Sequence, residues 1–427
     1  MRRIDPRRRT LLVDAVAYLG FAAFAGTSAL WSQFADYRIW GSLVLAAYLF
    51  GVTQALLLAF GVRLPGRIAG SRWTPVGLVA ALGMVIPLVV LVLRRAATNH
   101  LWSEQPEVWV VERGAALLLR TGTPYASFAF LHRPPTVADY VPYGPAMAVF
   151  GLPRAIFGPS AVTDARVMFA LVGIGAIALA LRLTGYPVVP VRALQLAVAC
   201  PLTALTFAIA GDDLPIAALT VLAIALLHRG RVAWSGTVIA IAVSMKLIAG
   251  PAAIVLAVAV FGMWGMLGLR RFAAAAGGTT LLLTVPVCLV DPTAFIEQVV
   301  RFPLGMGLAH SPAASPLPGQ LISRLGPVGH GTALALLAGL ALAMAIWLYR
   351  RPPRTAAAAA ARIATGLAAA VLLAPATRYG YLIYPCVLLA TALTLRAPRP
   401  APIEEAMIGA GRGAGEAPAI ESIPMID

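Results

Sequence analysis

The chain contains little charge and only one lysine. Only 12% of its 427 residues are charged, 60% are hydrophobic, and the mean hydropathy is +0.85. This composition excludes an ordinary soluble domain. A helix that spans a bilayer needs about 20 mostly apolar residues, because its backbone groups must be satisfied within the segment. Many segments of the chain meet this requirement, so we predict an all-α, polytopic transmembrane protein.

Cysteines and familiar nucleotide or zinc motifs are also scarce. The three cysteines lie inside apolar runs, at Cys200, Cys288 and Cys386. Their odd number and spacing give neither a disulfide framework nor a metal site. No Walker loop, dinucleotide fingerprint, HExxH motif or paired CxxC motif occurs in a supporting context. The sequence therefore lacks the usual signs of ATP-driven transport and zinc hydrolysis and predicts no cofactor with certainty, while a need for a divalent metal stays open.

The positive charge follows the membrane topology. The net charge is +16, which by itself would fit a nucleic-acid-binding protein. The arginines, however, cluster in short loops between apolar runs, beginning with RRIDPRRR near the amino terminus. An excess of arginine in short loops marks the cytoplasmic side of a membrane protein. We therefore expect the lipid bilayer as a partner and no nucleic acid.

The apolar runs predict about twelve membrane spans. The expected spans are 11–31, 39–60, 74–94, 165–184, 192–210, 214–228, 233–249, 251–268, 273–290, 332–349, 358–374 and 380–396. An amino terminus inside the cell places every arginine-rich short loop in the cytoplasm. We thus predict a multi-pass protein of the plasma (inner) membrane with both termini cytoplasmic and an extracytoplasmic active site.

Composition divides the chain into four regions. They are the N-terminal spans with their arginine-rich cytoplasmic start (1–94), an extracytoplasmic catalytic loop with short re-entrant or interfacial helices (95–164), a transmembrane bundle that includes the outer loop 291–331 (165–396), and a disordered cytoplasmic tail rich in Pro, Gly, Ala and Glu (397–427). Within the catalytic loop, Tyr143–Phe157 is apolar but short and interrupted by prolines. We therefore expect it to be re-entrant or interfacial rather than spanning.

The outer loop 95–164 gathers acids, arginines, aromatics and prolines as no other stretch does. Its candidate general bases are Glu104, Glu107, Glu112 and Asp139. Glu107 opens an apolar, helical run and therefore lies near a helix amino terminus that faces the outer membrane surface. A carboxylate in that place can take a proton from a hydroxyl group. Glu112, one or two turns further on, can instead pair with Arg113 or Arg120.

The only lysine, Lys246, lies near the outer end of a predicted span. A lysine at a helix end can extend its side chain to the membrane surface without any further role. Ionisable residues within spans are nevertheless costly, and they often mark functional sites. Because Asp212 and Asp213 lie at the same depth, we favour anion binding slightly over the structural role.

Gly211-Asp212-Asp213 forms a tight outer turn between two spans. Two adjacent carboxylates are not expected to face one point on a helix. We expect one of them to cap the following helix and the other to meet Lys246, Arg378 or a substrate hydroxyl. For either aspartate taken singly, capping and a functional role are equally supported.

Two further outer segments carry candidate contacts. The loop 291–331 contains Arg301 and His310 among prolines and small residues, a composition typical of a loop that covers a site. Arg378 and Tyr379 lie at the outer end of the penultimate span. An arginine at the membrane surface is a suitable partner for a lipid phosphate, because its guanidinium offers two parallel donors.

Taken together, these residues resemble the membrane-embedded GT-C glycosyltransferases. The likeness points to the family-87 type of actinobacteria, which are polyprenyl-phosphomannose-dependent mannosyltransferases. The matching residues are Glu107, Gly114, Gly122-Thr123-Pro124-Tyr125, Arg133-Pro134-Pro135, Tyr143-Gly144-Pro145, Gly211-Asp212-Asp213, Lys246 and Ala374–Tyr381. The likeness covers the organisation of roughly residues 75–396, with short specific matches. The family's usual base is an aspartate, whereas the aligned residue here is Glu107, and two extra spans precede the catalytic loop.

The resemblance implies inverting transfer of a hexose, mannose in that family, from a polyprenyl-phosphate donor to an extracytoplasmic glycan or glycolipid. Glu107, or Asp139 in second place, would deprotonate the acceptor hydroxyl that attacks the anomeric carbon. Lys246, Arg378 and Arg301 would hold the departing phosphate. Further implied substrate contacts are Tyr379, Asp212, Asp213, His310, Arg133 and Tyr125.

Two other functions stay open. A transporter or flippase for a lipid-linked saccharide would explain the intramembrane charges and the spans equally well. It would explain the acid-rich outer loop less well, and no inverted repeat is visible in the sequence. An inactive scaffold for envelope assembly is the third possibility, because Glu107 stands where the family has an aspartate.

Overall fold

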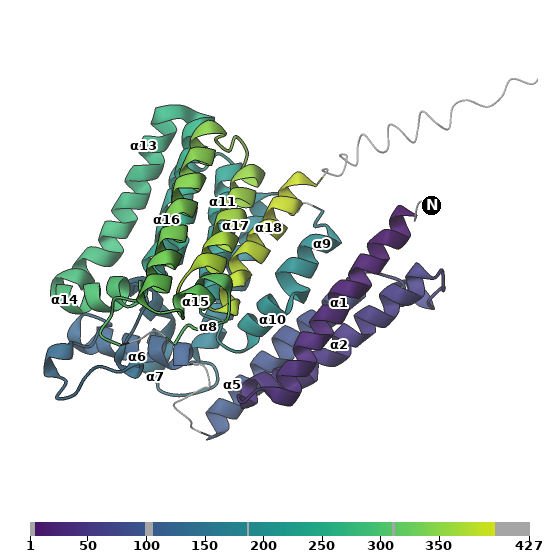
Figure 1. Cartoon of the computed structure of the whole chain (residues 1–427), viewed down its shortest axis with the longest axis horizontal. Coiled ribbons are helices and arrows are strands. Elements are labelled where there is room, and N and C mark those ends of the chain that lie inside the picture. The colour runs from purple at the N-terminus through teal and green to yellow at the C-terminus, as the bar shows by residue number, and fades with distance from the viewer. Residues whose placement is uncertain (1–4, 99–105, 186–187, 310–311, 398–427) are drawn as a thin grey trace, which may run out of the picture.

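The described part of the chain is almost entirely helical. In the computed structural model it comprises residues 5–98, 106–185, 188–309 and 312–397. These residues contain no strand, and a single isolated bridge among them joins Ala314 to Thr377. The predicted all-α class is confirmed. Figure 1 shows long helices running side by side, with short helices and loops gathered at one end of the bundle.

The helices follow one another along the chain with short connections. The α-helices are α1 (Pro6–Trp31), α2 (Ala35–Ala59), α3 (Gly66–Ala69), α4 (Trp73–Val79), α5 (Ile86–Thr98), α6 (Pro106–Thr121), α7 (Leu152–Phe157), α8 (Ala165–Leu183), α9 (Val191–Leu194), α10 (Pro201–Ala208), α11 (Asp213–His228), α12 (Val232–Met245), α13 (Gly250–Val290), α14 (Pro292–Phe295), α15 (Pro318–Ser323), α16 (Pro327–Arg350), α17 (Ala356–Leu373) and α18 (Ile383–Arg396). The 3-10 turns are η2 (Phe128–Phe130), η3 (Val137–Asp139), η4 (Pro145–Gly151), η6 (Leu247–Ala249) and η8 (Tyr379–Leu382), and the π-helical turns are η1 (Ala80–Val85), η5 (Gln195–Ala199) and η7 (Ile296–Arg301).

Eight helices in the described ranges are long and apolar enough to cross a membrane, or nine if the bent pair α9–α10 forms one span. The chain is thus a multi-pass membrane protein, whereas the predicted count of about twelve is not confirmed. The difference lies in two places. Helices α11 and α12 are apolar but only 16 and 14 residues long, and α13 runs over 41 residues through two predicted spans.

Helix α11 forms the centre of the bundle. Its side chains from Pro215 to Leu227 are buried without interruption. A helix that is apolar on all sides needs apolar neighbours on all sides. Helices α8, α12, α17 and α18 supply them, since each packs against α11. Asp213, at the start of α11, is therefore held inside protein rather than against lipid.

Helices α1 and α2 form a hairpin beside α9 and α10 (Figure 1). The Tyr48 hydroxyl of α2 donates to the carbonyl of Ala199 at 2.9 Å, across the break between the two bent helices. Asp14 of α1 binds Arg72 at 2.6 Å and Arg192 at 2.8 Å. These contacts hold the hairpin against the bundle, so its aromatic side chains can form one wall of the cavity described below.

The segment from 106 to 164, which the sequence predicts to be extracytoplasmic, packs directly on the end of α12. The Gly144 amide donates to the carbonyl of Met245 at 2.8 Å. A Cβ atom at position 144 would lie only 2.2 Å from the carbonyl oxygen of Ser244, so no larger residue fits without displacing the backbone. After Gly144, the apolar segment 145–157 forms η4 and α7, and both pack against α6.

The described part of loop 291–331, also predicted to be extracytoplasmic, pairs with the chain around Arg378. The Thr377 amide donates to the carbonyl of Ala313, and the Ser315 amide donates to the carbonyl of Thr377, both at 2.9 Å. The Ser315 hydroxyl then accepts from the Tyr379 amide at 3.1 Å. This short stretch of strand-like pairing fixes the backbone on both sides of Arg378.

Candidate active site

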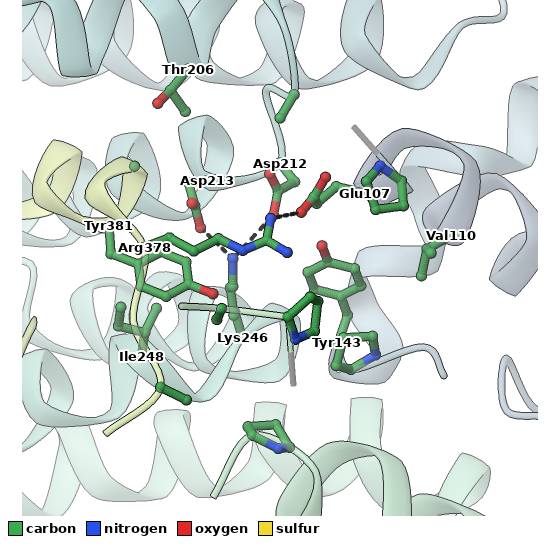
Figure 2. Close-up of a pocket in the computed structure, with 18 of the residues that line it drawn as sticks. Glu107, Val110, Tyr143, Thr206, Asp212, Asp213, Lys246, Ile248, Arg378 and Tyr381 are labelled. Carbon is green, nitrogen blue, oxygen red and sulfur yellow. Dashed lines mark hydrogen bonds and ion pairs between the residues drawn. The ribbon is translucent and has the colours of Figure 1, made fainter. Parts of the chain in front are cut away.

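A cavity of about 890 Å³ lies at the end of the bundle where the short helices gather. Its charged side chains come from distant parts of the chain. They are Glu107 in the first turn of α6, Asp212 and Asp213 at the start of α11, Lys246 directly after α12, and Arg378 ahead of η8. Figure 2 shows these side chains pointing toward one another across the cavity.

One ion pair in the cavity joins Glu107 to Arg378, which lie 271 positions apart. The Arg378 guanidinium donates to Oε1 of Glu107. Glu107 is 9% exposed, and its Oε2 atom is buried without a hydrogen-bond partner among the described residues. Burial disfavours the charge on Arg378, but the Glu107 carboxylate outweighs that effect and raises the pKa of Arg378 above its usual value. Glu107 thus has one oxygen that accepts no hydrogen bond from the described residues.

Lys246 donates to two aspartates at once. Its ammonium lies 3.1 Å from Oδ2 of Asp212 and 2.6 Å from Oδ1 of Asp213. The Tyr384 hydroxyl also donates to Asp213, at 2.6 Å. The expectation that the two carboxylates would not face one point was therefore wrong. Asp212 lies at the N-cap position, outside the regular helix, and its side chain makes no capping hydrogen bond, so both carboxylates reach the same ammonium.

Aromatic rings enclose the Lys246 ammonium. Its Nζ atom lies 5.4 Å from the ring centre of Tyr143 and 4.9 Å from that of Tyr381, within the range of cation–π attraction. The Tyr125 hydroxyl donates to the carbonyl of Tyr143 at 2.8 Å. Tyr125 itself is buried and does not line the cavity, so it supports Tyr143 instead of reaching a substrate.

The cavity holds three carboxylates and two cations, and every one of them is ion-paired. An unpaired charge in such a place costs several kcal/mol, so pairing is what keeps these groups ionised. Three negative charges against two positive charges leave a net charge of −1. An anionic ligand would therefore be held by directed hydrogen bonds and not by an excess of positive charge. Within the described ranges, no three His, Cys, Asp or Glu side chains come together as metal ligands.

Asp139, the second predicted base, lies outside the cavity. Both of its oxygens accept from the Arg133 guanidinium at 2.7 Å, and Thr136 donates to it as well. The hydrogen bonds from Arg133 are the main reason that the pKa of Asp139 lies well below its usual range. Arg133 is half exposed and does not line the cavity either. Of the predicted bases in the described ranges, only Glu107 lines the cavity.

The other predicted contacts are divided. Tyr379 lines the cavity. Arg301 does not, because it pairs with Glu297 at 3.2 Å and exposes 52% of its side chain. His310 lies outside the described residues, as do Glu104 and residues 398–427 of the predicted tail.

Glu112 belongs to a buried ionic cluster and not to the cavity. Arg95 donates to its two oxygens at 2.9 and 2.7 Å, and Arg154 lies 3.3 Å away. Arg95 also binds Asp164, at 2.9 Å. The arginines predicted as partners, which follow Glu112 closely in the sequence, make none of these contacts. The cluster ties α6 to α5, α7 and the start of α8, and so it fixes the helix that carries Glu107.

Part of the cavity wall was not predicted. Phe24, Phe34 and Tyr37 of the N-terminal hairpin line the cavity. An aromatic side chain in or beside an apolar span has the same sequence signature whether it faces lipid or a cavity, so the sequence offered no signal for them. Tyr384 was missed for the same reason, although it contacts Asp213.

Comparison with known protein families decides the class of the chain. The model of glycosyltransferase family 87 matches residues 140–375, which is more than half of the chain. The chain belongs to glycosyltransferase family 87. It is therefore a membrane glycosyltransferase of the GT-C type, as the sequence resemblance predicted.

No curated protein sequence matches the chain. Among solved structures, a crystal structure of ArnT from Cupriavidus metallidurans bound to undecaprenyl phosphate is similar, with a TM-score of 0.45 and 19% sequence identity. The alignment covers 81% of this chain and 64% of that one, so the match spans less than two thirds of the length of that protein.

The family match and the cavity overlap only in part. The matched range contains Tyr143, Asp212, Asp213 and Lys246. Glu107 lies ahead of that range, and Arg378 lies just beyond it. This glycosyltransferase therefore joins the two sides of its cavity with an ion pair that comes from segments outside the matched range.

Proposed function

We propose that this family-87 member transfers a hexose, with mannose as the first choice, from polyprenyl phosphate to a hydroxyl group of an extracytoplasmic glycan or glycolipid. The observation that carries the proposal is the meeting of Glu107, Lys246 and Arg378 in one cavity. A carboxylate beside two cations is the set of groups that a sugar transfer with a phosphate leaving group needs.

The reaction is a single inverting displacement. The acceptor oxygen forms a bond to the anomeric carbon while the bond from that carbon to the phosphate oxygen breaks. The electron pair of the broken bond leaves with the polyprenyl phosphate. Glu107 takes the proton of the acceptor hydroxyl through its unpartnered Oε2 atom. A positioned base of this kind typically accelerates a reaction by about 10²–10⁴-fold.

Arg378 couples donor binding to the strength of the base. Its guanidinium is held by Glu107 in the absence of substrate. A donor phosphate competes for the same guanidinium, because both are oxyanions that accept charge-assisted hydrogen bonds. When the phosphate takes Arg378, Glu107 loses a neighbouring positive charge and becomes a better proton acceptor.

Lys246 stabilises the charge that develops on the leaving phosphate. Asp212 and Asp213 hold the ammonium in place at 3.1 and 2.6 Å, and the rings of Tyr143 and Tyr381 flank it. The ammonium is therefore oriented before the donor arrives. Prior orientation lets it stabilise the leaving group without paying for reorganisation during the reaction.

The apolar wall of the cavity receives the prenyl chain. Phe24 and Phe34 come from the N-terminal hairpin, and Leu202, Leu205 and Ile209 come from α10 and its end. A prenyl chain has no polar groups, so it is stabilised by burial against such side chains in proportion to the area removed from water. The arginine-rich loops support a cytoplasmic position for the opposite end of the bundle, and the proposed reaction therefore belongs to the extracytoplasmic side.

A transfer assay tests the proposal. The purified protein is incubated in vesicles with radiolabelled polyprenyl-phosphate mannose or other hexoses and with a panel of glycan and glycolipid acceptors. We expect a new glycosidic product that is lost in Glu107→Gln and kept in Asp139→Asn, because only Glu107 lines the cavity. Labelled lipid that crosses the bilayer without forming any product would instead indicate that the protein is a transporter.

A further inference from the structure

A second cavity, of about 420 Å³, lies between the start of α12 and a bend in α13. Its main lining residues are Gly230, Arg231, Trp234, Trp264, Leu267 and Arg271. Figure 1 shows α13 turning at the end of the bundle that lies away from α6 and α14. The second cavity is therefore at the opposite end of the bundle from the candidate active site, among the loops that the arginine pattern assigns to the cytoplasm.

The bend in α13 builds one side of this cavity. Gly265 interrupts the helix with φ 63° and ψ −159°, a backbone conformation that residues with a side chain avoid. The interruption comes directly after Trp264, and Leu267 and Arg271 follow it within two turns. The bend thus turns an aromatic, an apolar and a cationic side chain toward the start of α12.

The charge around the cavity is uncompensated. Arg231 and Arg271 are exposed, and neither forms an ion pair with any residue in the described part of the chain. The sequence contains no Asp or Glu from 214 to 290 and none from 298 to 403. Two arginines without a nearby acid favour an anionic ligand over a neutral or cationic one.

Two tryptophans give the cavity an interfacial character. Trp234 is 63% exposed and Trp264 is 39% exposed. Partly exposed tryptophans are typical of the membrane surface, where the ring meets apolar chains and the N–H group meets water. Leu267, which is 62% exposed, adds apolar surface next to the two arginines. A free phosphate ion would not use this apolar surface, whereas a phospholipid would.

We propose that this cavity binds the phosphate headgroup of an anionic phospholipid from the cytoplasmic leaflet. Arg231 and Arg271 bind the phosphate, and the tryptophans lie at the level of the glycerol and the upper acyl chains. The volume lies within the range of about 300–1,000 Å³ that is usual for small-ligand sites. Basic pockets between helices at the cytoplasmic surface are suited to such headgroups, because the anionic lipids of that leaflet supply the matching charge.

Native mass spectrometry of the delipidated protein with added lipid tests the proposal. Phosphatidylglycerol and phosphatidylcholine of equal chain length are compared. We expect tighter binding of phosphatidylglycerol, and about 25-fold weaker binding in the double variant Arg231→Ala/Arg271→Ala, at about fivefold for each lost surface arginine. The matched control Arg63→Ala/Arg396→Ala removes two exposed arginines from other predicted cytoplasmic positions and should change the affinity less than twofold.

A second arm uses lipid with bromine in the upper acyl chain, which quenches nearby tryptophan fluorescence. Brominated phosphatidylglycerol should quench the protein more than brominated phosphatidylcholine does, and Trp234→Phe/Trp264→Phe should remove the difference without any loss of charge. Equal binding of the two lipids would overturn the proposal, and so would unchanged binding in the arginine double variant. Displacement of the lipid by millimolar inorganic phosphate would overturn the proposal and indicate that the cavity binds the free anion.

Discussion

Lys246 shows how one residue can be flagged by the sequence and explained only by the fold. Its uniqueness and its place near a span end marked it as unusual. The structure adds its two carboxylate partners, at 3.1 and 2.6 Å, and its two tyrosine rings. Asp212 and Asp213 precede it by more than thirty positions, so no local pattern records that both reach one ammonium.

Lys246→Met should be strongly destabilising, because it leaves two carboxylates without their cation. Breaking a buried ion pair typically costs about 3–5 kcal/mol of unfolding free energy. Asp213→Asn in addition should recover part of that loss, since one unpaired charge is then removed, while sugar transfer stays absent. Thermal unfolding and the transfer assay on the same samples measure both. Full transfer in the double variant would show that Lys246 has no part in the reaction.

Arg378→Lys keeps the positive charge and removes the two parallel donors of the guanidinium. An ammonium offers a compact point charge in place of two parallel donors, so it binds a carboxylate and a phosphate less well at the same place. We expect the KM for the polyprenyl-phosphate donor to rise by about tenfold, which corresponds to about 1.4 kcal/mol. Arg301→Lys is the control, because Arg301 does not line the cavity. Equal donor KM values in both variants would show that Arg378 does not bind the donor.

At the scale of the helices, each sequence pattern predicted only the structural property that it depends on. Hydropathy located the helices, since apolar length is a property of a continuous segment. Hydropathy predicted two spans, 251–268 and 273–290, with Arg270 between them, whereas α13 bends at Gly265. Charge marks a membrane boundary, but a bend depends on backbone conformation, which hydropathy does not report. Helices α11 and α12, with 16 and 14 residues, are shorter than the about 20 residues that a span needs, and protein surrounds α11 along most of its length.

Gly144 offers a test of how the segment from 106 to 164 is held on α12. Gly144→Ala adds a Cβ atom that would lie 2.2 Å from the carbonyl oxygen of Ser244, so the segment must move away from α12. Tyr143 then leaves the Lys246 ammonium, and we expect transfer to fall by about tenfold or more. Gly175→Ala in α8 is the matched control, because a Cβ atom there meets nothing within 4 Å. Equal activity of the two variants would contradict the proposed role of the contact.

At the scale of the whole molecule, the sequence predicted the class and the meeting of Glu107, Lys246 and Arg378 more successfully than it predicted individual pairings. Membership of a family constrains which segments come together, and the short motifs carried that information. Pairings such as Glu112 with Arg95, or Arg133 with both oxygens of Asp139, depend on the relative placement of α5, α6 and the loops. Neither composition nor helical periodicity reports that placement.

The proposed topology can be measured on whole cells. In a variant with Cys200, Cys288 and Cys386 replaced by alanine, a single cysteine is introduced either as Phe130→Cys or as Arg229→Cys. Phe130 is 81% exposed in the loop 95–164, predicted to be extracytoplasmic, and Arg229 lies exposed between α11 and α12. A membrane-impermeant maleimide should label the first cysteine in intact cells and the second only after lysis. The reverse pattern would place the cavity in the cytoplasm.

In the proposed reaction, Glu107 acts as the base while Arg378 passes from Glu107 to the donor phosphate. Donor affinity and single-turnover transfer, measured together in Glu107→Gln, test this exchange. Because the amide no longer competes for the guanidinium, we expect donor binding at least as tight as in the native protein. We also expect transfer slower by about 10²–10⁴-fold. Transfer at the native rate, or donor binding lost together with transfer, would contradict the proposed exchange.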